Sequence, residues 1–270
     1  EHKERADITN QFHRANRHLI FIEFKQTWGE VVMESLRGLQ TKSSWALYEN
    51  IRTGFSLEDV VITLVCCLLI FVAYNVMEAS LSTVKQKAWI VMLVSSTVLS
   101  ICGIFYVARA QYFQLWTNEY IYAEDFLSRC IMLFFLSSNI MDLVLGVQYY
   151  PKFLDPLSTI SHHIFYILFI TTLLACHYSR GFILCFFMEI PTCLLAIGTI
   201  WERARSDALF GMSFLATRVL YNIYLAYRLF CLSPEGVIWK ICVSVLGLHL
   251  FWFSKWMKTY GYKALETLLS

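Results

Sequence analysis

Seven long apolar stretches follow one another from Leu57 onward, separated by short polar segments. A helix needs about 20 mostly apolar residues to cross the roughly 30 Å hydrocarbon layer of a membrane. The stretches lie at 57–77, 88–108, 127–147, 160–176, 182–200, 209–230 and 236–256. Charged residues make up 16% of the 270 residues, against roughly a quarter in a soluble domain. The sequence therefore predicts an all-α, polytopic membrane bundle of about seven transmembrane helices.

The sixth stretch differs from the others because Arg218, Asn222 and Arg228 interrupt it. A charged side chain at the centre of a bilayer is costly unless it is paired or faces a wet interior. Two interpretations stay open. The stretch is either a span with its polar residues turned into the bundle, or an amphipathic helix in the membrane interface.

Residues 1–56 contain no spanning run, but apolar residues recur at helical spacing between Phe21 and Leu39, with charged residues between them. This periodicity fits an amphipathic helix in the interface or a helix docked on protein, and does not separate the two. The rest of the chain divides into a first span at 57–80, a six-helix domain at 81–258 and a tail at 259–270.

The loop charges predict an orientation. Seven spans put the two ends of the chain on opposite sides, and Lys and Arg concentrate on the cytosolic side of membrane proteins. The side of the C-terminus carries Lys85, Lys87, Lys152, Arg203, Arg205, Lys255, Lys258 and Lys263, against Arg52, Arg109 and Arg180 on the other. We therefore expect a cytosolic C-terminus.

Polar residues inside the spans are the first candidates for function, because each is costly to place in hydrocarbon. Asn139 and Asp142 stand three apart and so share one face of the third span. The other candidates are Glu189 in the fifth span, Arg218 and Asn222 in the sixth and His249 in the seventh. Acids and arginines at similar depth can also pair simply to fix helix packing.

The fourth span opens with adjacent histidines, His162 and His163, and Ser158 is the expected N-cap of its helix. The positive end of a helix disfavours imidazolium, so we expect a neutral ring there. A neutral imidazole can take a proton from an attacking amine or hydroxyl, or attack a thioester itself. Against this, two histidines at a membrane boundary are also compatible with simple interfacial polar residues.

Other classes of function find little support. The histidines lack the spacing of metal ligands, so no metal is expected. The net charge is only +2 and the basic residues are scattered, which argues against a nucleic acid partner. The nine cysteines lie mostly inside apolar runs, where they act as small hydrophobes rather than as a disulfide framework.

The double histidine in Ser161-His162-His163-Ile164, the following Ser179-Arg180-Gly181 and the acid Glu189 resemble the TLC-domain membrane proteins, which include the ceramide synthases. The resemblance runs from about Leu81 to Lys258, which makes the six-helix domain a TLC-like core with one additional span before it.

The chain departs from the synthase pattern after the double histidine. Arg180 and Gly181 are adjacent, Met188 stands where the synthases have a histidine, and Glu189 and Thr192 replace two aspartates. The stretch Glu189-Ile190-Pro191-Thr192 is more similar to the Glu-x-Ser/Pro-Thr pattern of the smaller, non-synthase members.

The resemblance implies a lipid-handling protein of the endoplasmic reticulum that transfers a fatty acyl group from acyl-CoA, its co-substrate, to an amine or hydroxyl of a membrane lipid. It implies catalytic roles for His162, His163, Asp142 and Glu189, and substrate-binding roles for Asn139, Arg180, Arg218, Asn222 and His249. The alternative is a non-catalytic lipid-binding or scaffold subunit. A homo-oligomer or a partner within a membrane complex stays open, because lipid-facing and subunit-facing surfaces look alike in sequence.

Overall fold

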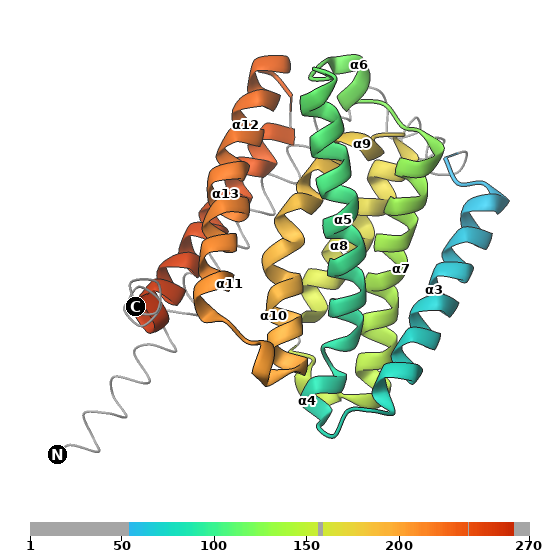
Figure 1. The fold of residues 1–270 in the computed structure, drawn as a ribbon. Coiled ribbons are helices and arrows are strands. Elements are labelled where there is room, and N and C mark those ends of the chain that lie inside the picture. The colour runs from blue at the N-terminus through green and yellow to red at the C-terminus, as the bar shows by residue number, and fades with distance from the viewer. Residues whose placement is uncertain (1–53, 156–158, 237, 262–270) are drawn as a thin grey trace. The chain divides into compact units, whose positions relative to one another are not determined.

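The structure, a computed structural model, describes residues 54–155, 159–236 and 238–261 (Figure 1). In this part of the chain every regular element is helical, which confirms the predicted all-α bundle. The elements are α3 (Leu57–Glu78), α4 (Val84–Lys87), α5 (Ile90–Tyr112), α6 (Asn118–Ile121), α7 (Phe126–Tyr149), η1 (Pro151–Phe153), α8 (Ser161–Ala175), α9 (Ser179–Ile183), η3 (Leu184–Glu189), α10 (Ile190–Ile200), η4 (Glu202–Ala204), α11 (Asp207–Phe214), η5 (Leu215–Leu220), α12 (Tyr221–Leu232), α13 (Ile238–Trp256) and η6 (Met257–Gly261).

Among the described residues, six continuous helical segments are long and apolar enough to cross a membrane, so the chain is a multi-pass membrane protein. They are Leu57–Glu78, Val84–Tyr112, Phe126–Tyr149, Ser179–Ile200, Asp207–Leu232 and Ile238–Gly261. The predicted fourth span is also an apolar helix, but α8 has only 15 residues, about 22 Å at 1.5 Å per residue. It falls short of the length expected of a full span.

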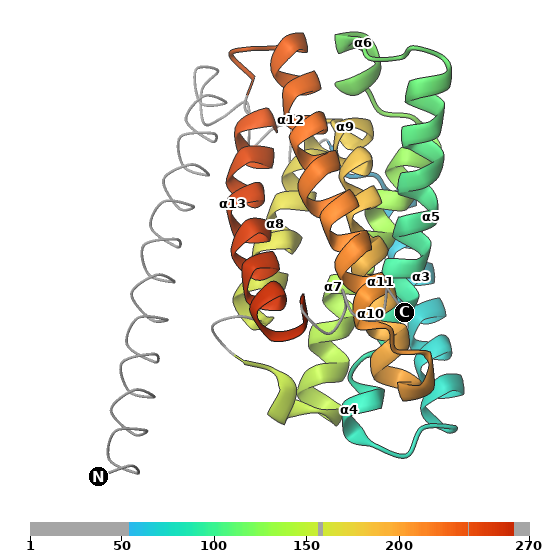
Figure 2. The ribbon, with the colours of Figure 1, turned by 60° about the vertical axis from the view of Figure 1, so that its left-hand side comes forward.

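The helices alternate in direction along the bundle (Figures 1 and 2). At one end, Arg129 near the start of α7 bonds to Asp59 at the start of α3 and to the Leu174 carbonyl at the end of α8. At the other end, α4 bonds to the Ile200 carbonyl through Gln86. α8 therefore runs antiparallel to α7.

The sixth stretch forms one continuous segment through α11, η5 and α12, as the spanning interpretation requires. Asn222 is fully buried, and Arg218 turns toward η3 and α10, where it bonds to the Met188 carbonyl. Arg218 and Asn222 therefore face the inside of the bundle, and the interfacial helix is not what the structure has.

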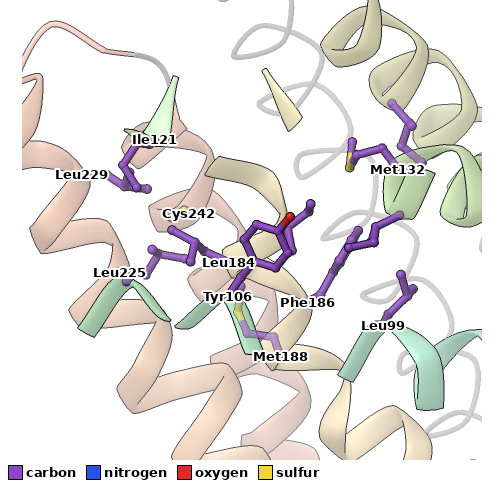
Figure 3. Close-up of a cluster of buried hydrophobic side chains, with 14 of the residues drawn as sticks. Leu99, Tyr106, Ile121, Met132, Leu184, Phe186, Met188, Leu225, Leu229 and Cys242 are labelled. Atoms are coloured by element: carbon purple, nitrogen blue, oxygen red, sulfur yellow. The ribbon is translucent and has the colours of Figure 1, made fainter. Parts of the chain in front are cut away.

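α5 crosses η3 with almost no space between the two backbones. A Cβ atom at Gly103 would lie 2.3 Å from the backbone nitrogen of Phe187, so only glycine permits this approach. Around the crossing, Leu99 and Tyr106 of α5 meet Leu184 and Phe186 of η3 in the largest buried hydrophobic cluster of the described residues (Figure 3). The crossing places the end of η3, and with it Glu189, inside the bundle.

One of the sequence-based boundaries changes, and others fall on residues that the structure does not describe. The link predicted at His177 to Gly181 is shorter, because α9 begins at Ser179. The predicted N-cap, Ser158, and the amphipathic segment up to residue 53 lie outside the described residues. Most of the tail at 259–270 lies outside them too.

Candidate active site

His163 lies in the first turn of α8 and is buried against the second half of α7. Its Nε2 atom is 2.9 Å from Oδ2 of Asp142, and its Nδ1 atom is 2.9 Å from Oδ1 of Asn139. Both partners come from the single face of α7 that their three-residue spacing predicted. The structure therefore brings together three of the predicted site residues.

The surrounding bonds fix how His163 is held. The Asn139 side-chain amide nitrogen donates to the Phe135 carbonyl at 2.8 Å, so its Oδ1 faces the ring and accepts from Nδ1. The Asp142 carboxylate also accepts the Tyr150 hydroxyl at 2.9 Å. Both ring nitrogens of His163 are thus engaged, and neither has a lone pair free for a substrate.

His162, the neighbouring residue, lies in the opposite situation. Its side chain is exposed and makes no hydrogen bond with any residue that the structure describes. Its ring packs edge-on against Tyr166, one turn along α8, with 4.7 Å between centroids. Adjacent residues on a helix point about 100° apart, which explains how one imidazole is buried and the other accessible. His162 is therefore the ring whose nitrogens are free.

Arg218 forms a second group with the fifth predicted span. Its Nε donates to the Met188 carbonyl at 2.9 Å and its Nη2 to Oγ1 of Thr192 at 2.5 Å. The same Nη2 lies 3.7 Å from the Glu189 carboxylate. The expected pairing of an arginine with an acid is found, but Glu189 meets Arg218 rather than a histidine.

His249 and Asn222 lie beside Arg218. Nδ1 of His249 donates to the Arg218 carbonyl at 2.9 Å. This carbonyl belongs to η5, a π-helical turn, and such turns are frequent at functional sites. Asn222 is 3.4 Å from the same ring nitrogen, and its Oδ1 atom is buried without a partner among the described residues. His249 therefore fixes the turn that carries Arg218.

The two groups belong to one polar cluster. His162 lies within electrostatic range of both Asp142 and Arg218. Tyr166, which contacts His162, lies within the same range of Glu189 and Arg218. Residues of α7, α8, η3, α10, η5, α12 and α13 thus meet at one depth in the bundle.

Arg180 does not join this cluster. Its Nε donates to the carboxylate of Asp125 at 2.9 Å, and its guanidinium lies 5.0 Å from the centre of the Tyr120 ring. Asp125 caps the start of α7, 17 residues before Asp142, which corresponds to about 25 Å along the helix. The structure separates Arg180 from the other predicted site residues by most of the bundle's length.

Asp125 lies outside the spans, and its surroundings shift its ionisation. Burial raises the pKa of this carboxyl, but hydrogen bonds from the Ser128 N–H and from Arg180 outweigh burial and hold the pKa below its ordinary value of 3.8. The pair is an ion pair that anchors α9 to the start of α7.

The sequence analysis missed three participants. Tyr150 engages Asp142, and nothing in the local pattern identified it. Thr192 engages Arg218; the motif comparison named it in place of an aspartate but assigned it no role. Tyr166 carried a usable signal, because a residue four positions after His162 on a helix must lie above it.

No group of three or more His, Cys, Asp and Glu that could hold a metal ion occurs among residues 54–155, 159–236 and 238–261. The candidate site consists instead of one free imidazole, two engaged carboxylates and a guanidinium. The imidazole can accept a proton or attack a carbonyl carbon, and the guanidinium can donate hydrogen bonds to the oxygen atoms of a substrate.

Comparison with known proteins gives one match. A family model described as TLC domain matches residues 85–258, from α4 to η6. No curated protein and no solved structure matches the chain.

Proposed function

Because the chain belongs to the TLC-domain family, with the matched region covering the whole candidate site, we propose that it transfers a fatty acyl group from acyl-CoA to a membrane lipid. His162 is the reacting residue. The lipid-related role follows the family, and the transfer step rests on the arrangement of the two histidines.

The observation that carries the proposal is the different state of the two imidazoles. His163 is held by Asp142 and Asn139, whereas His162 is accessible and free of hydrogen bonds to the described residues. A neutral imidazole with a free lone pair is the side chain best suited to acyl transfer near neutral pH.

The step is a substitution at the thioester carbonyl. His162 attacks the carbonyl carbon, a C–N bond forms, the C–S bond breaks, and the CoA thiolate leaves and takes up a proton. The lipid acceptor then attacks the acyl-imidazole and loses its proton, and the free imidazole returns. His163, Asp142 and Asn139 act as positioning residues, because they hold the first turn of α8.

The basic residues support an orientation for this reaction. Lys85, Lys87 and Arg203 belong to elements at one end of the bundle, where α4 meets the end of α10. Arg205 joins this end to η6 through the Tyr260 hydroxyl. We expect this end, with the C-terminus, to face the cytosol of the endoplasmic reticulum membrane, where acyl-CoA is soluble. Tag accessibility after selective permeabilisation tests the orientation.

The test of activity uses the full chain in lipid nanodiscs with labelled long-chain acyl-CoA and mixed lipid acceptors. We expect acyl-lipid product from the wild-type chain and none from His162→Ala. The matched control is His177→Ala, which removes an exposed histidine at the opposite end of the bundle.

Since His162 is exposed, its replacement should leave the unfolding temperature unchanged, and that measurement accompanies the assay. Transfer by His162→Ala at the wild-type rate would overturn the proposal. Lipid binding without transfer by the wild-type chain would favour the alternative, a non-catalytic lipid-binding or scaffold subunit.

A further inference from the structure

Each acid of the candidate site already has a cationic or hydrogen-bonding partner. Asp142 is matched by His163 and also accepts the Tyr150 hydroxyl. Glu189 faces the guanidinium of Arg218 at 3.7 Å. A protonated amine brought into this place would need a carboxylate of its own, because an unpaired charge is costly away from water. Both acids are therefore already engaged before any substrate enters.

The Arg218–Glu189 pair still has unused hydrogen-bonding capacity. Nε and Nη2 of Arg218 donate to Met188 and Thr192. The third nitrogen, Nη1, has no hydrogen-bond partner among the described residues. The Glu189 carboxylate is 27% exposed, and its contact with Arg218 is too long for a strong hydrogen bond. A free donor thus lies next to a free acceptor.

A hydroxyl group suits this arrangement, since it donates one hydrogen bond and accepts others. An ammonium group only donates, and beside Glu189 it would also lie close to the positive guanidinium. Hydrogen-bonding capacity and charge therefore both favour a hydroxyl over an ammonium group as the acyl acceptor.

We propose that the acyl acceptor is an uncharged lipid alcohol, whose hydroxyl accepts from Nη1 of Arg218 and donates to Glu189. This inference rests on the proposed function and names the class of its acceptor. It assigns Arg218 and Glu189 as binding residues for the hydroxyl and makes the product an ester rather than an amide.

The pair is close enough to the reacting histidine to serve it. Tyr166 contacts the His162 ring and lies within electrostatic range of both Arg218 and Glu189. His249 holds the carbonyl of the π-helical turn from which Arg218 extends. The pair and the imidazole that carries the acyl group are therefore linked through Tyr166, which contacts the ring and lies within electrostatic range of the pair.

The second half of the reaction balances without another reactant. The hydroxyl oxygen attacks the acyl carbon on His162, the C–O bond of the ester forms and the C–N bond to the imidazole breaks. The imidazole gave its N–H proton to the departing CoA thiolate in the first half, and now takes up the hydroxyl proton by way of the Glu189 carboxylate, so the neutral ring returns and CoA leaves as the thiol.

The test compares 1-hexadecanol with hexadecylamine, two probes that share a chain and differ in the head group. The full chain in nanodiscs receives both at equal concentration with palmitoyl-CoA, and mass spectrometry measures ester and amide. We expect ester to exceed amide by at least about tenfold, because a site built for a hydroxyl strongly rejects a group that cannot use its bonds. Amide formation equal to or above ester formation would overturn the inference while leaving the transfer reaction in place.

Two variants test the assigned residues. Glu189→Gln keeps the size of the side chain and removes its charge, and Arg218→Gln leaves Glu189 without a cation. We expect both to lower ester formation, and Arg218→Gln also to raise the amide-to-ester ratio. An unchanged ratio in an Arg218→Gln protein that still unfolds at the wild-type temperature would contradict the assignment.

A binding measurement separates this inference from the transfer reaction. In His162→Ala, which cannot form the acyl-imidazole, 1-hexadecanol should raise the unfolding temperature more than hexadecylamine does. Equal or greater stabilisation by the amine would overturn the inference whether or not the wild-type chain transfers acyl groups.

Discussion

Nε2 of His163 lies 2.9 Å from the Asp142 carboxylate, and the two side chains join α8 to α7 at a buried position. α8 packs mainly along α7, so this pair fixes the first turn of a helix that is shorter than a full span. The accessible His162 follows from it, because the burial of one ring sets the direction of the other.

Replacing His163 by alanine should therefore destabilise the protein. Asp142 would be left buried without its partner, and breaking such a pair costs about 3–5 kcal/mol. Thermal unfolding in detergent measures the loss. Gln148→Ala, an exposed change on α7, the helix that carries Asp142, should have little effect. A His163→Ala protein as stable as the wild type would show that the pair does not hold α8.

A methyl group at Gly103 should separate α5 from η3. The new Cβ would meet the backbone of Phe187 at 2.3 Å, and backbone cannot turn aside as a side chain can. We expect Gly103→Ala to cost about 1–3 kcal/mol or more. The matched control is Gly247→Ala, where no atom lies within 4 Å and the change should be neutral or stabilising. Equal unfolding temperatures for the two variants would contradict the close crossing.

Arg129→Gln should loosen α3 from the bundle. The guanidinium bonds to Asp59 and to Glu124, both at 2.6 Å, and also reaches the Gly54 carbonyl. Its removal takes the guanidinium away from two largely buried acids, and we expect a loss of about 3–5 kcal/mol. Arg205→Gln breaks an exposed pair with Asp207 and should cost less than about 1 kcal/mol. Comparable losses in the two variants would argue against a special role for Arg129.

The ion pair of Asp125 and Arg180 should appear in the dependence of stability on pH. The pKa of Asp125 is lower in the folded state than its ordinary value of 3.8. Its contribution to folding stability is therefore complete above 3.8 and is lost as the pH falls through the lower folded pKa. Arg180→Gln should raise that folded pKa, so that the loss of stability in acid begins at a higher pH. Unfolding temperatures from about pH 3 to about pH 6 measure the change, with Arg203→Gln at an exposed position as the control. Superimposable profiles for wild type and Arg180→Gln would exclude the effect.

The positions of the helices could be predicted because a bilayer imposes one rule of length and polarity on every span. α8 covers 161–175 where hydropathy placed a helix at 160–176. The irregular turns could not be predicted in this way. The 3₁₀ turn η3 and the π turn η5 depend on contacts with other helices, at Gly103 and at His249, that no local pattern contains.

The sequence predicted which residues belong to the candidate site better than it predicted which of them contact one another. Helical spacing indicated that Asn139 and Asp142 share a face, but not that this face meets His163. Register between helices decides such partners, and it is set by packing across the whole bundle. For the same reason Arg180, only nine residues before Glu189, lies at the far end with Asp125.

The histidines lie close to one end of the bundle, and their depth determines how far the reactants must enter the membrane. Asp142 stands seven residues before the end of α7, which sets the twin imidazoles about 10 Å inward from that helix end. On the proposed reaction, a bulky, charged carrier can stay in the water and only its thioester has to descend to this depth. The lipid acceptor arrives from the leaflet on the same side, so neither reactant crosses the middle of the bilayer.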